Sequence, residues 1–416
     1  MKLKKYKLGD LCTFVNGRAY LQPELQNYGK YKIVRVGNLS GGNNSWYYSD
    51  MELEPTKYCA KGDLLYAWAC NFGPYIWKGD KTIYHYHIWK VINSEQIDKM
   101  YLYYLLKFMT NSFMGCVHGS TMLHITKENM ESMEVRIHAS IEEQRRIATI
   151  LNKLDCKIEL NRQINDNLEA MAKQLYDYWF VQFDFPNEEG KPYKSSGGAM
   201  LWNEKLKREI PLGWSVLSVN DIAASVRGVS YAKDDMVDSN NGVLVLRGNN
   251  IQDNRLIYDS NVAYIPSSFV SENQRIRPLD IIMTMSSGSK EHIGKSAMFQ
   301  FASEDTFGAF LTKFTAKEHC AYLLFNLFNS KYFKAKIKSI ACGTGINNLT
   351  NQTFDEIYVV MPEDELLLEF DKRQSQIFAE IGLIGKSNIE LTKQRDELLP
   401  LLMNGQASVN YHLSDD

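Results

Sequence analysis

The chain has 416 residues, of which 44% are hydrophobic and 23% charged, a balance that argues against a disordered or fibrous protein. Its net charge of −2 provides no bulk attraction to a polyanion, so a nucleic-acid contact would have to use local basic patches. No apolar run reaches the ~18 residues of a membrane-spanning helix, no apolar leader segment follows Met1, and the seven cysteines form no C-x-x-C pair. We therefore expect a soluble, intracellular protein of two or three domains without disulfides.

The first segment, residues 1–139, is expected to be a globular domain, and much of it recurs later in the chain. The string GSTMLHIT at 119–126 reappears as GTGINNLT at 343–350, and alternating apolar residues at 133–137 and 357–361 predict a strand after each string. Near the start, Gly17 and Tyr20 match Gly228 and Tyr231. The displacement drifts from 211 to 224 residues, as expected for two diverged copies of one domain with small loop insertions.

A long helix is expected after each copy, over residues 140–182 and 363–405. Each carries a core stripe with alternating steps of four and three residues over about five heptads, which is typical of a coiled coil. At 1.5 Å per residue, ~33 helical residues span about 50 Å. Antiparallel packing of the two helices would relate the copies by a pseudo-twofold axis. The residues expected to pair the helices are Leu154, Ile158, Asn165, Leu168, Ile377, Ile381, Asn388 and Leu391.

Asn165 and Asn388 occupy the same stripe position in the two helices. A polar residue at such a position costs stability and fixes helix register. The alternative is that the stripe is shifted and both asparagines face solvent.

The remaining segments connect or end these parts. Residues 183–209 are rich in Pro, Gly, Ser and Asn and predict a connector with turns. Residues 210–362 form the second globular copy, and residues 406–416 are a short tail.

Several kinds of catalytic site fail on spacing. The loop at 288–296 has five residues between its glycines where a phosphate-binding loop needs four. His85 and His87 lack further ligands at metal-binding spacing, so a partly buried strand pair is the better interpretation. Asp184, Glu189 and Lys191 only faintly resemble a nuclease metal site, in a connector too flexible to preorganise one. No Asn-Pro-Pro-aromatic motif for base methylation is present. By elimination, the sequence indicates a scaffold that recognises another molecule.

Over nearly its whole length, the chain resembles the DNA-specificity subunit of type I restriction–modification systems. The most specific strings are YWF at 178–180 leading into FDFPN at 183–187, GKPYKSSGG at 190–198, and IPLGW at 210–214. The helix entry EQRRI at 143–147 and the closing LLPLLMNG at 398–405 are also similar to that family.

This resemblance implies two target-recognition domains, each reading one half of a split DNA site, and paired helices that set the spacing. It implies two methyltransferase subunits docked on the helices and a restriction/translocase subunit, in a prokaryotic cytoplasm. Cofactors would lie on those partners (S-adenosylmethionine, ATP and Mg), with none in this chain and no catalytic or metal-binding residue. Two departures predict unequal docking: the first domain lacks the IPLGW entrance, and Leu367 stands where the first helix has Gln144.

Residues in loops that occur in both copies are the candidates for DNA contact, because phosphate and base contacts need polar side chains in exposed loops. For each one, a turn-forming role without a ligand is the alternative. Arg35 and Arg247 lie within predicted strands next to asparagines, where a structural salt bridge competes with base contact. The DNA candidates are Arg18, Tyr20, Asn71, Lys78, Ser120, Thr121, His124, Ser230, Tyr231, Lys290, Lys295, Thr344, Asn347 and Asn348. The candidates for partner docking are Gln144, Tyr176, Phe180 and Leu399, for which burial in the chain's own core is the alternative.

The sequence thus predicts an α/β (α+β) protein with two repeated recognition domains joined by two long antiparallel coiled-coil helices. Its predicted function is non-catalytic reading of a DNA sequence. Two other classes remain open: a self-contained nuclease or methylase with a diverged site, and a coiled-coil adaptor with no role on DNA.

Overall fold

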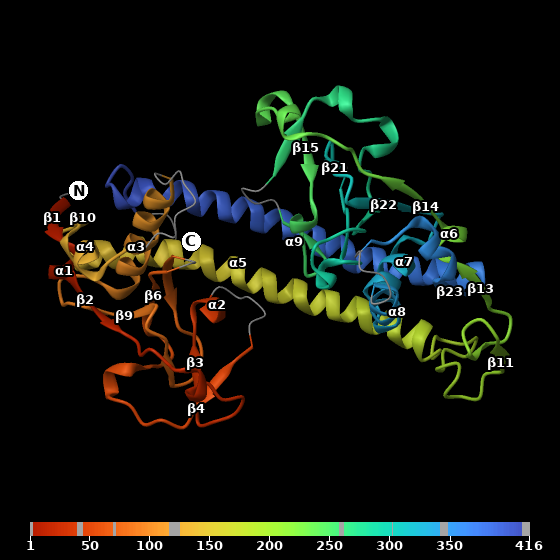
Figure 1. Ribbon diagram of the computed structural model, residues 1–416, viewed down its shortest axis with the longest axis horizontal. Helices are drawn as coiled ribbons and strands as arrows, with labels where there is room; N and C mark the ends of the chain where they lie inside the picture. Colours follow the sequence, from red (N-terminus) through yellow and green to blue (C-terminus); the bar gives the residue numbers. More distant parts are fainter. Residues whose placement is uncertain are drawn as a thin grey trace, which may run out of the picture. The chain divides into compact units, whose positions relative to one another are not determined.

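A computed structural model describes residues 3–39, 45–69, 72–115, 125–257, 262–301, 303–341 and 348–409 (Figure 1). The chain divides into two compact units: unit 1 is Met1–Leu160 with Asn388–Asp416, and unit 2 is Asn161–Ser387. The predicted boundaries treated the helices as separate segments. The structure instead divides each helix between the two units, because each half packs on its own globular part. Within the described residues, no helix is long and apolar enough to cross a membrane.

The described residues of unit 1 form two four-stranded sheets and a two-stranded one. The first sheet has the order β2-β9-β6-β7 with antiparallel neighbours, and the second has the order β4-β3-β8-β5 with a parallel β3–β8 pair. The third pairs β1 with β10. The strands are β1 (Leu3–Lys7), β2 (Cys12–Asn16), β3 (Tyr31–Val34), β4 (Tyr47–Ser49), β5 (Tyr58–Cys59), β6 (Leu64–Ala67), β7 (Gly73–Ile76), β8 (Thr82–Tyr84), β9 (Ile88–Asn93) and β10 (Glu134–His138). The helices before α5 are α1 (Leu8–Leu11), α2 (Val36–Leu39), α3 (Lys99–Gly115) and α4 (Lys127–Ser132).

Unit 2 repeats this plan. Its four-stranded sheet has the order β14-β22-β19-β20, and its second sheet, β18-β15-β21, again contains a parallel pair, β15–β21. A third sheet pairs β13 with β23, and β16 pairs with β17. The strands are β13 (Ser215–Ser218), β14 (Ala223–Arg227), β15 (Val243–Leu246), β16 (Ile251–Gln252), β17 (Arg255–Leu256), β18 (Ala263–Ile265), β19 (Ile281–Thr284), β20 (Ser296–Met298), β21 (Thr306–Phe307), β22 (Leu311–Ala316) and β23 (Tyr358–Met361). The helices are α6 (Val219–Ile222), α7 (Ala321–Asn329) and α8 (Lys331–Ala341). The predicted internal repeat is therefore confirmed for the main sheet, for the parallel pair of the second sheet and for the strand pair β1–β10 or β13–β23. Among the described residues, β5 has no counterpart in unit 2, and the β16–β17 pair has none in unit 1.

Gly17 and Gly228, matched in the sequence, occupy the same tight crossing in the two units. A Cβ on Gly17 would lie 2.4 Å from the carbonyl oxygens of Tyr84 and His85, and one on Gly228 would lie 2.3 Å from those of Phe307 and Gly308. No side chain fits at such distances, so only glycine allows the two backbone segments to meet. The crossing brings the end of β2 to the end of β8, and the end of β14 to the end of β21.

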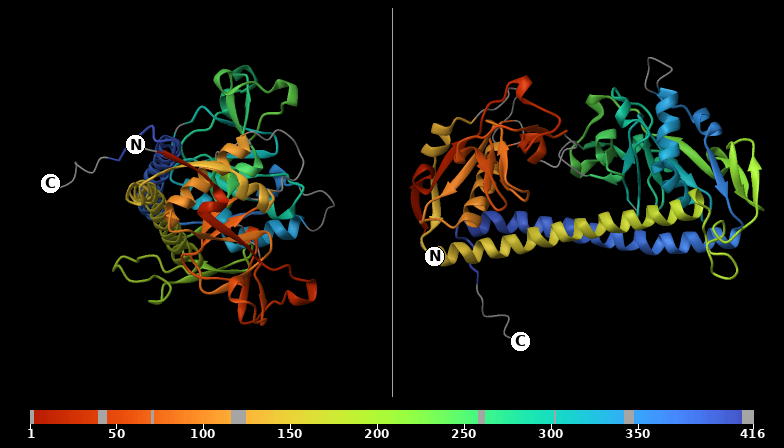
Figure 2. Two further views of the ribbon diagram at one scale, coloured as in Figure 1. Left: turned by 90° about the vertical axis from the view of Figure 1, so that its left-hand side faces the viewer. Right: turned by 90° about the horizontal axis from the view of Figure 1, so that it is seen from below.

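Two long helices continue the globular parts. Helix α5 (Ile141–Tyr176) has 36 residues and passes into a π-helical segment, η3 (Asp177–Val181), and α9 (Asp364–Met403) has 40 residues. The right-hand view of Figure 2 shows them running alongside each other. In unit 2 the Gln374 side chain donates to the Ala172 carbonyl at 2.8 Å, and Asn165 donates to the Ile381 carbonyl at 3.5 Å. From the first bond to the second, the residue number decreases in α5, from 172 to 165, and increases in α9, from 374 to 381. The two helices are therefore antiparallel, as predicted.

The predicted heptad stripe faces inward along both helices. None of its twenty members, ten in each helix, is exposed: Ile147, Leu151, Leu154, Ile158, Asn161, Asn165, Leu168, Ala172, Leu175 and Trp179; Phe370, Gln374, Ile377, Ile381, Ile384, Asn388, Leu391, Arg395, Leu398 and Leu402. In unit 1, the end of α9 (Leu399, Leu402, Met403) joins the core made by α3 and the start of α5.

The connector at 183–209 is more ordered than its composition predicts. It contains β11 (Met200–Asn203), which pairs with β12 (Arg208–Pro211) as a hairpin. The Phe185 ring stacks on Tyr193 at 4.6 Å and on Trp214 at 4.8 Å between centroids. This aromatic stack fixes the corner where the chain leaves η3 and enters the second sheet system.

Candidate nucleic-acid interface

In each unit, four strands of the main sheet and one of the second sheet bring their connecting turns to one edge. In unit 1, Asn16 pairs with Trp89, Ala67 with both Ile88 and Gly73, and Val34 with Tyr84. These pairs bring together the ends of β2, β3 and β6 with the starts of β7 and β9. The corresponding pairs in unit 2 bring together the ends of β14, β19 and β15 with the starts of β20 and β22. We call this the strand-end edge of each unit.

The strand-end edge carries an arginine stacked on a tyrosine in both units. The Arg35 guanidinium lies 4.5 Å from the Tyr47 ring centroid, and that of Arg247 lies 5.9 Å from the Tyr231 ring and donates to its hydroxyl at 2.9 Å. Each arginine backbone N–H donates to the asparagine three residues on, Asn38 or Asn250. Within the described ranges, no carboxylate lies within ion-pairing distance of either guanidinium. The alternative in which these arginines form structural salt bridges is therefore wrong among the described residues. Neither arginine is one of the predicted DNA candidates.

Arg18, which was selected, is less available. Its guanidinium donates two hydrogen bonds to the Glu24 carboxylate, at 2.7 and 3.1 Å, and Glu24 also accepts from the Leu21 N–H. This pair closes the turn that follows β2. Tyr20 is half-buried against His85, and its hydroxyl has no hydrogen-bond partner among the described residues. Burial raises the pKa of Tyr20, so the phenol stays neutral at ordinary pH.

The turn between β8 and β9 in unit 1 is a cluster of rings. Its residues are His85, Tyr86 and His87, and the centroids of the last two rings lie 3.9 Å apart. Trp68, at the end of β6, lies edge-on to His87 at 5.1 Å, and its indole donates to the Tyr86 carbonyl. Burial, His87 and Arg35 together lower the pKa of His85 to about 4. In the described part of the chain, no group of three or more His, Cys, Asp or Glu could hold a metal ion.

The same turn in unit 2 has the sequence Gly308-Ala309-Phe310. The equivalence follows from backbone contacts: Trp68 N–H donates to the His87 carbonyl at 3.1 Å, and Met285 N–H donates to the Phe310 carbonyl at 2.9 Å. Phe310 is 66% exposed. Phe310 is not among the residues predicted from the sequence, although extending the repeat through 85–87 and 308–310 aligns the two turns.

The other described DNA candidates divide between two places. Ser230 is exposed beside Tyr231, and Asn348 bridges to Ser286 just beyond β19, so these belong to the strand-end edge of unit 2. Lys295 lies there too, before β20, with its ammonium 2.9 Å from the His292 ring. Lys78 is placed elsewhere: it follows β7 at the opposite end of the sheet and pairs with Glu159 of α5 at 3.3 Å. The structure thus separates Lys78 from the other loop candidates, because β7 carries it to the opposite end of the sheet. Contact of Lys78 with DNA stays a prediction.

The remaining candidates cannot be placed. Asn71, Ser120, Thr121, His124, Thr344 and Asn347 lie outside the described residues, as does the side chain of Lys290.

The eight helix-pairing residues all lie on the inner faces of α5 and α9. Ile158 and Leu391 are buried, Ile377 and Ile381 pack on the unit 2 core, and Leu154, Leu168 and Asn388 are half-buried. Asn165 is 7% exposed, and its side-chain oxygen has no partner among the described residues. The alternative in which both asparagines are fully solvated is therefore wrong.

The residues selected for partner docking are buried instead. Gln144 has no exposed surface: its amide oxygen accepts from Asp98 N–H at 2.8 Å, and its amide nitrogen donates to the carbonyls of His138 and Gln96. Leu399 is 2% exposed in the unit 1 core. The expectation of direct side-chain docking is thus wrong for Gln144 and Leu399, because both are used to close unit 1.

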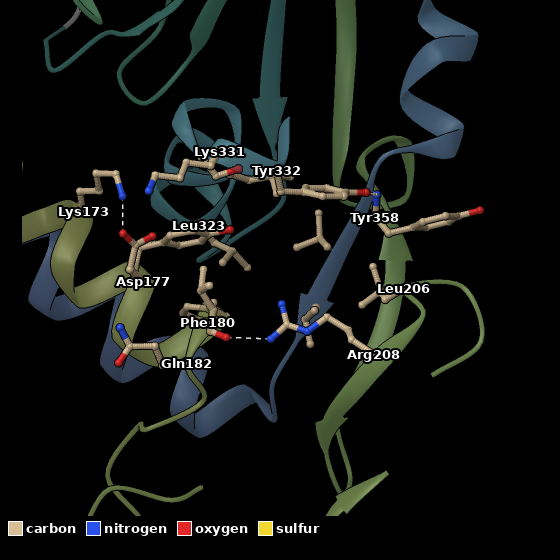
Figure 3. A pocket seen from close by; sticks show the side chains of 16 residues that line it. Lys173, Asp177, Phe180, Gln182, Leu206, Arg208, Leu323, Lys331, Tyr332 and Tyr358 are labelled. Atoms are coloured by element: carbon tan, nitrogen blue, oxygen red, sulfur yellow. Dashed lines mark hydrogen bonds and ion pairs between the residues drawn. The ribbon is translucent and has the colours of Figure 1, made fainter. Parts of the chain in front are cut away.

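Tyr176 and Phe180 are 6% and 4% exposed, but they line a cavity of about 290 Å³ in unit 2 (Figure 3). Lys173 pairs with Asp177 at its rim, and Arg208 donates to the Val181 carbonyl at 2.7 Å. Burial holds the pKa of Arg208 below its usual value and raises that of Tyr176. A partner could reach these two aromatic residues only by entering the cavity.

Comparison with known proteins identifies similar chains. Residues 2–170 and 211–401 match the family model described as type I restriction modification DNA specificity domain. The type I restriction enzyme MjaIX specificity subunit of Methanocaldococcus jannaschii is 28% identical over 77% of this chain and 71% of its own length. The HindI specificity subunit of Haemophilus influenzae is 23% identical over 97% of this chain and 99% of its own length. The crystal structure of the type I S subunit from M. genitalium shares the fold, with a TM-score of 0.55, 16% identity and 96% of each chain covered.

Proposed function

Because the chain belongs to the type I restriction modification DNA specificity family, we propose that it is the non-catalytic DNA reader of such a system and that each unit binds one half of a split duplex site. The observation that carries this proposal is the strand-end edge itself. It occurs once in each unit and holds an arginine on a tyrosine, with no acidic partner among the described residues. Arginine in this state can donate to base edges or phosphates.

The two helices set the spacing between the half-sites. Half-sites on one face of B-DNA lie about one helical turn, ~34–36 Å, apart or at multiples of it. Both α5 and α9 run from one unit into the other without a flexible linker, and their inner faces are closed by the heptad stripe. A continuous helix pair changes length in defined steps, whereas a flexible linker would tolerate many spacers.

The methyltransferase subunits, two in number, dock on the outer faces of the helices. Ile164, Met171 and Tyr178 are spaced seven residues apart on unit 2 and are 38%, 53% and 39% exposed. Such spacing forms one face of a helix, and an apolar exposed stripe is typical of an interaction surface. S-adenosylmethionine belongs to these subunits, and ATP and Mg²⁺ to a restriction subunit, with the complex acting in the cytoplasm of a prokaryote.

Methylome sequencing of cells that carry the chain with its methyltransferase subunits tests the reader. We expect a two-part methylated motif that disappears when the chain is deleted. Arg247→Ala should relax the half read by unit 2 and leave the other half intact. Arg277→Ala is the control, because Arg277 precedes β19 at the opposite end of the sheet and pairs with Glu272. No motif with the wild-type chain would refute the proposal and favour an adaptor without a DNA role.

The spacing role has a separate test. Inserting one heptad after Leu160 and one after Ser387 keeps the stripe in phase and lengthens the helix pair by about 10 Å. We expect the spacer to grow by about three base pairs, at ~3.4 Å each, with both half-sites unchanged. An unchanged spacer would contradict the role of the helices.

Docking is tested by co-purification of the chain with the methyltransferase subunits. Met171→Glu places a charge in the exposed stripe and should reduce their recovery. Gln174→Glu, at an exposed neighbouring position, should not. Equal recovery with both variants would exclude this face.

A further inference from the structure

The turn between β21 and β22 presents a large apolar side chain to solvent in the middle of the polar strand-end edge. Phe310 is the most exposed large apolar residue of unit 2 within its described ranges, at 66%, whereas the next residue, Leu311, is completely buried. Within the described residues, Phe310 belongs to none of the apolar clusters of its unit. Folding therefore gives no reason for a phenyl ring at this position.

The backbone that carries Phe310 is fixed from three sides. Its carbonyl accepts from the Met285 N–H at 2.9 Å and from the Ser286 N–H at 3.3 Å. The Arg227 side chain donates to the neighbouring Ala309 carbonyl at 3.0 Å. Gly228 closes on Gly308 at the tight crossing described above. The ring is thus held outward on a rigid turn, a preorganised arrangement that reduces the entropy lost on binding.

Two arginines lie close to the backbone of this turn. Arg227 is bonded to the turn itself, and Arg247 lies on Tyr231, whose ring approaches Gly308. Among the described residues, no carboxylate pairs with either arginine. Such groups suit phosphates on either side of a contacted base pair, while the phenyl ring suits an apolar group between them.

Resting on the proposed function, we propose that Phe310 determines part of the base preference of unit 2 by contacting a thymine 5-methyl group in the major groove. A phenyl ring has no hydrogen-bond donor or acceptor, so it cannot read the polar pattern of base edges. The thymine methyl is the apolar group that the major groove offers. In unit 1, the matching position is His87, between Tyr86 and Trp68, so the same turn there presents polar ring atoms and reads a different pattern.

The test uses the chain assembled with its methyltransferase subunits and measures methylation rates on duplexes that carry the wild-type motif. Phe310→Ala should reduce the rate on the cognate half-site of unit 2 by roughly 5- to 100-fold, the cost of one mismatched pair, and leave the preference of the unit 1 half unchanged. Phe269→Ala is the matched control. Phe269 is also an exposed phenylalanine of unit 2, but it follows β18, at the end of the sheet β18-β15-β21 that lies opposite the strand-end edge.

Replacing each thymine of the unit 2 half-site by deoxyuridine removes only the methyl group. One such position should reproduce the loss with the wild-type chain and add nothing further in Phe310→Ala. If no position does so, or if Phe310→Ala keeps the full motif, the inference is overturned while the two-part motif still supports the proposed function. A wild-type chain without any two-part motif would instead refute the proposed function.

Discussion

Units 1 and 2 share a backbone plan but differ at its two ends. At one end, both units place a lysine–aspartate pair at matching positions, Lys90–Asp63 at 2.7 Å and Lys313–Asp280 at 3.2 Å. At the strand-end edge, the matching turns differ completely, with three rings in unit 1 and Gly308-Ala309-Phe310 in unit 2. The comparison teaches that the two copies retain the contacts that hold the sheets and diverge where a ligand would be read.

The largest expected effect comes from the buried pair of unit 2. The Lys313 and Asp280 side chains are 6% and 1% exposed, against 22% and 28% for Lys90 and Asp63. Lys313→Met leaves Asp280 buried without its cation and should lower the free energy of unfolding by about 3–5 kcal/mol. Lys90→Met should cost much less, since water reaches that pair. Urea unfolding measures both, with exposed Lys317→Met as control; equal losses would contradict the difference in burial.

The tight crossing should be equally sensitive in the two units. Gly17→Ala and Gly228→Ala each force a Cβ into backbone carbonyls, at an expected cost of about 1–3 kcal/mol for overpacking. Each should also impair reading of one half-site only, because the displaced turn belongs to one unit. Thermal unfolding and methylome sequencing measure these effects. Gly288→Ala is the control, since nothing lies within 4 Å of its Cβ position; a similar loss there would argue against a specific crossing.

The matched asparagines of the helices should respond unequally. Asn165 is buried with a long hydrogen bond of 3.5 Å and an unpartnered oxygen, whereas Asn388 is half-buried. Asn165→Leu should therefore raise the free energy of unfolding by about 1 kcal/mol, and Asn388→Leu should raise it less. If the asparagines fix register, the double variant will also methylate sites with altered spacers. Stabilisation with unchanged spacer selectivity would contradict the register hypothesis.

The smallest effect is a pH dependence confined to unit 1. The folded pKa of His85, about 4, lies below the ordinary value of ~6.5. As pH falls from ~6.5 toward 4, the unfolded chain takes up a proton that folded unit 1 does not, so stability decreases. His85→Gln should flatten this part of the dependence of the thermal midpoint on pH. Unit 2 has Gly308 at the matching position, which cannot titrate and so adds no second group of this kind. If the stability of His85→Gln still decreases by the same amount between pH ~6.5 and about 4, His85 is not the cause of the pH dependence.

The sequence predicts those parts of the molecule in which residue types recur at a regular spacing. The repeat, the two helices and their inner stripe follow from spacing alone, because heptads and matched strings depend on residue type and not on distant contacts. The strand-end edge is different. The sequence does not distinguish Arg18 from Arg35. In the structure, Glu24 pairs with Arg18, whereas Arg35 lies on Tyr47. The first contact depends on how the turn at 21–24 folds back toward Arg18. Gln144 likewise resembles a surface residue until Asp98 and His138 close around it.

The division of the chain has a consequence for its synthesis. Unit 1 includes Leu399, Leu402 and Met403 in its core, so the amino-terminal domain emerges from the ribosome well before the residues that seal it. At roughly 5–20 residues per second, the wait lasts on the order of ten seconds to a minute. Throughout that interval, the part of the unit 1 core that Leu399, Leu402 and Met403 cover in the folded protein is exposed to solvent, and such transiently exposed apolar surface favours aggregation of the nascent chain.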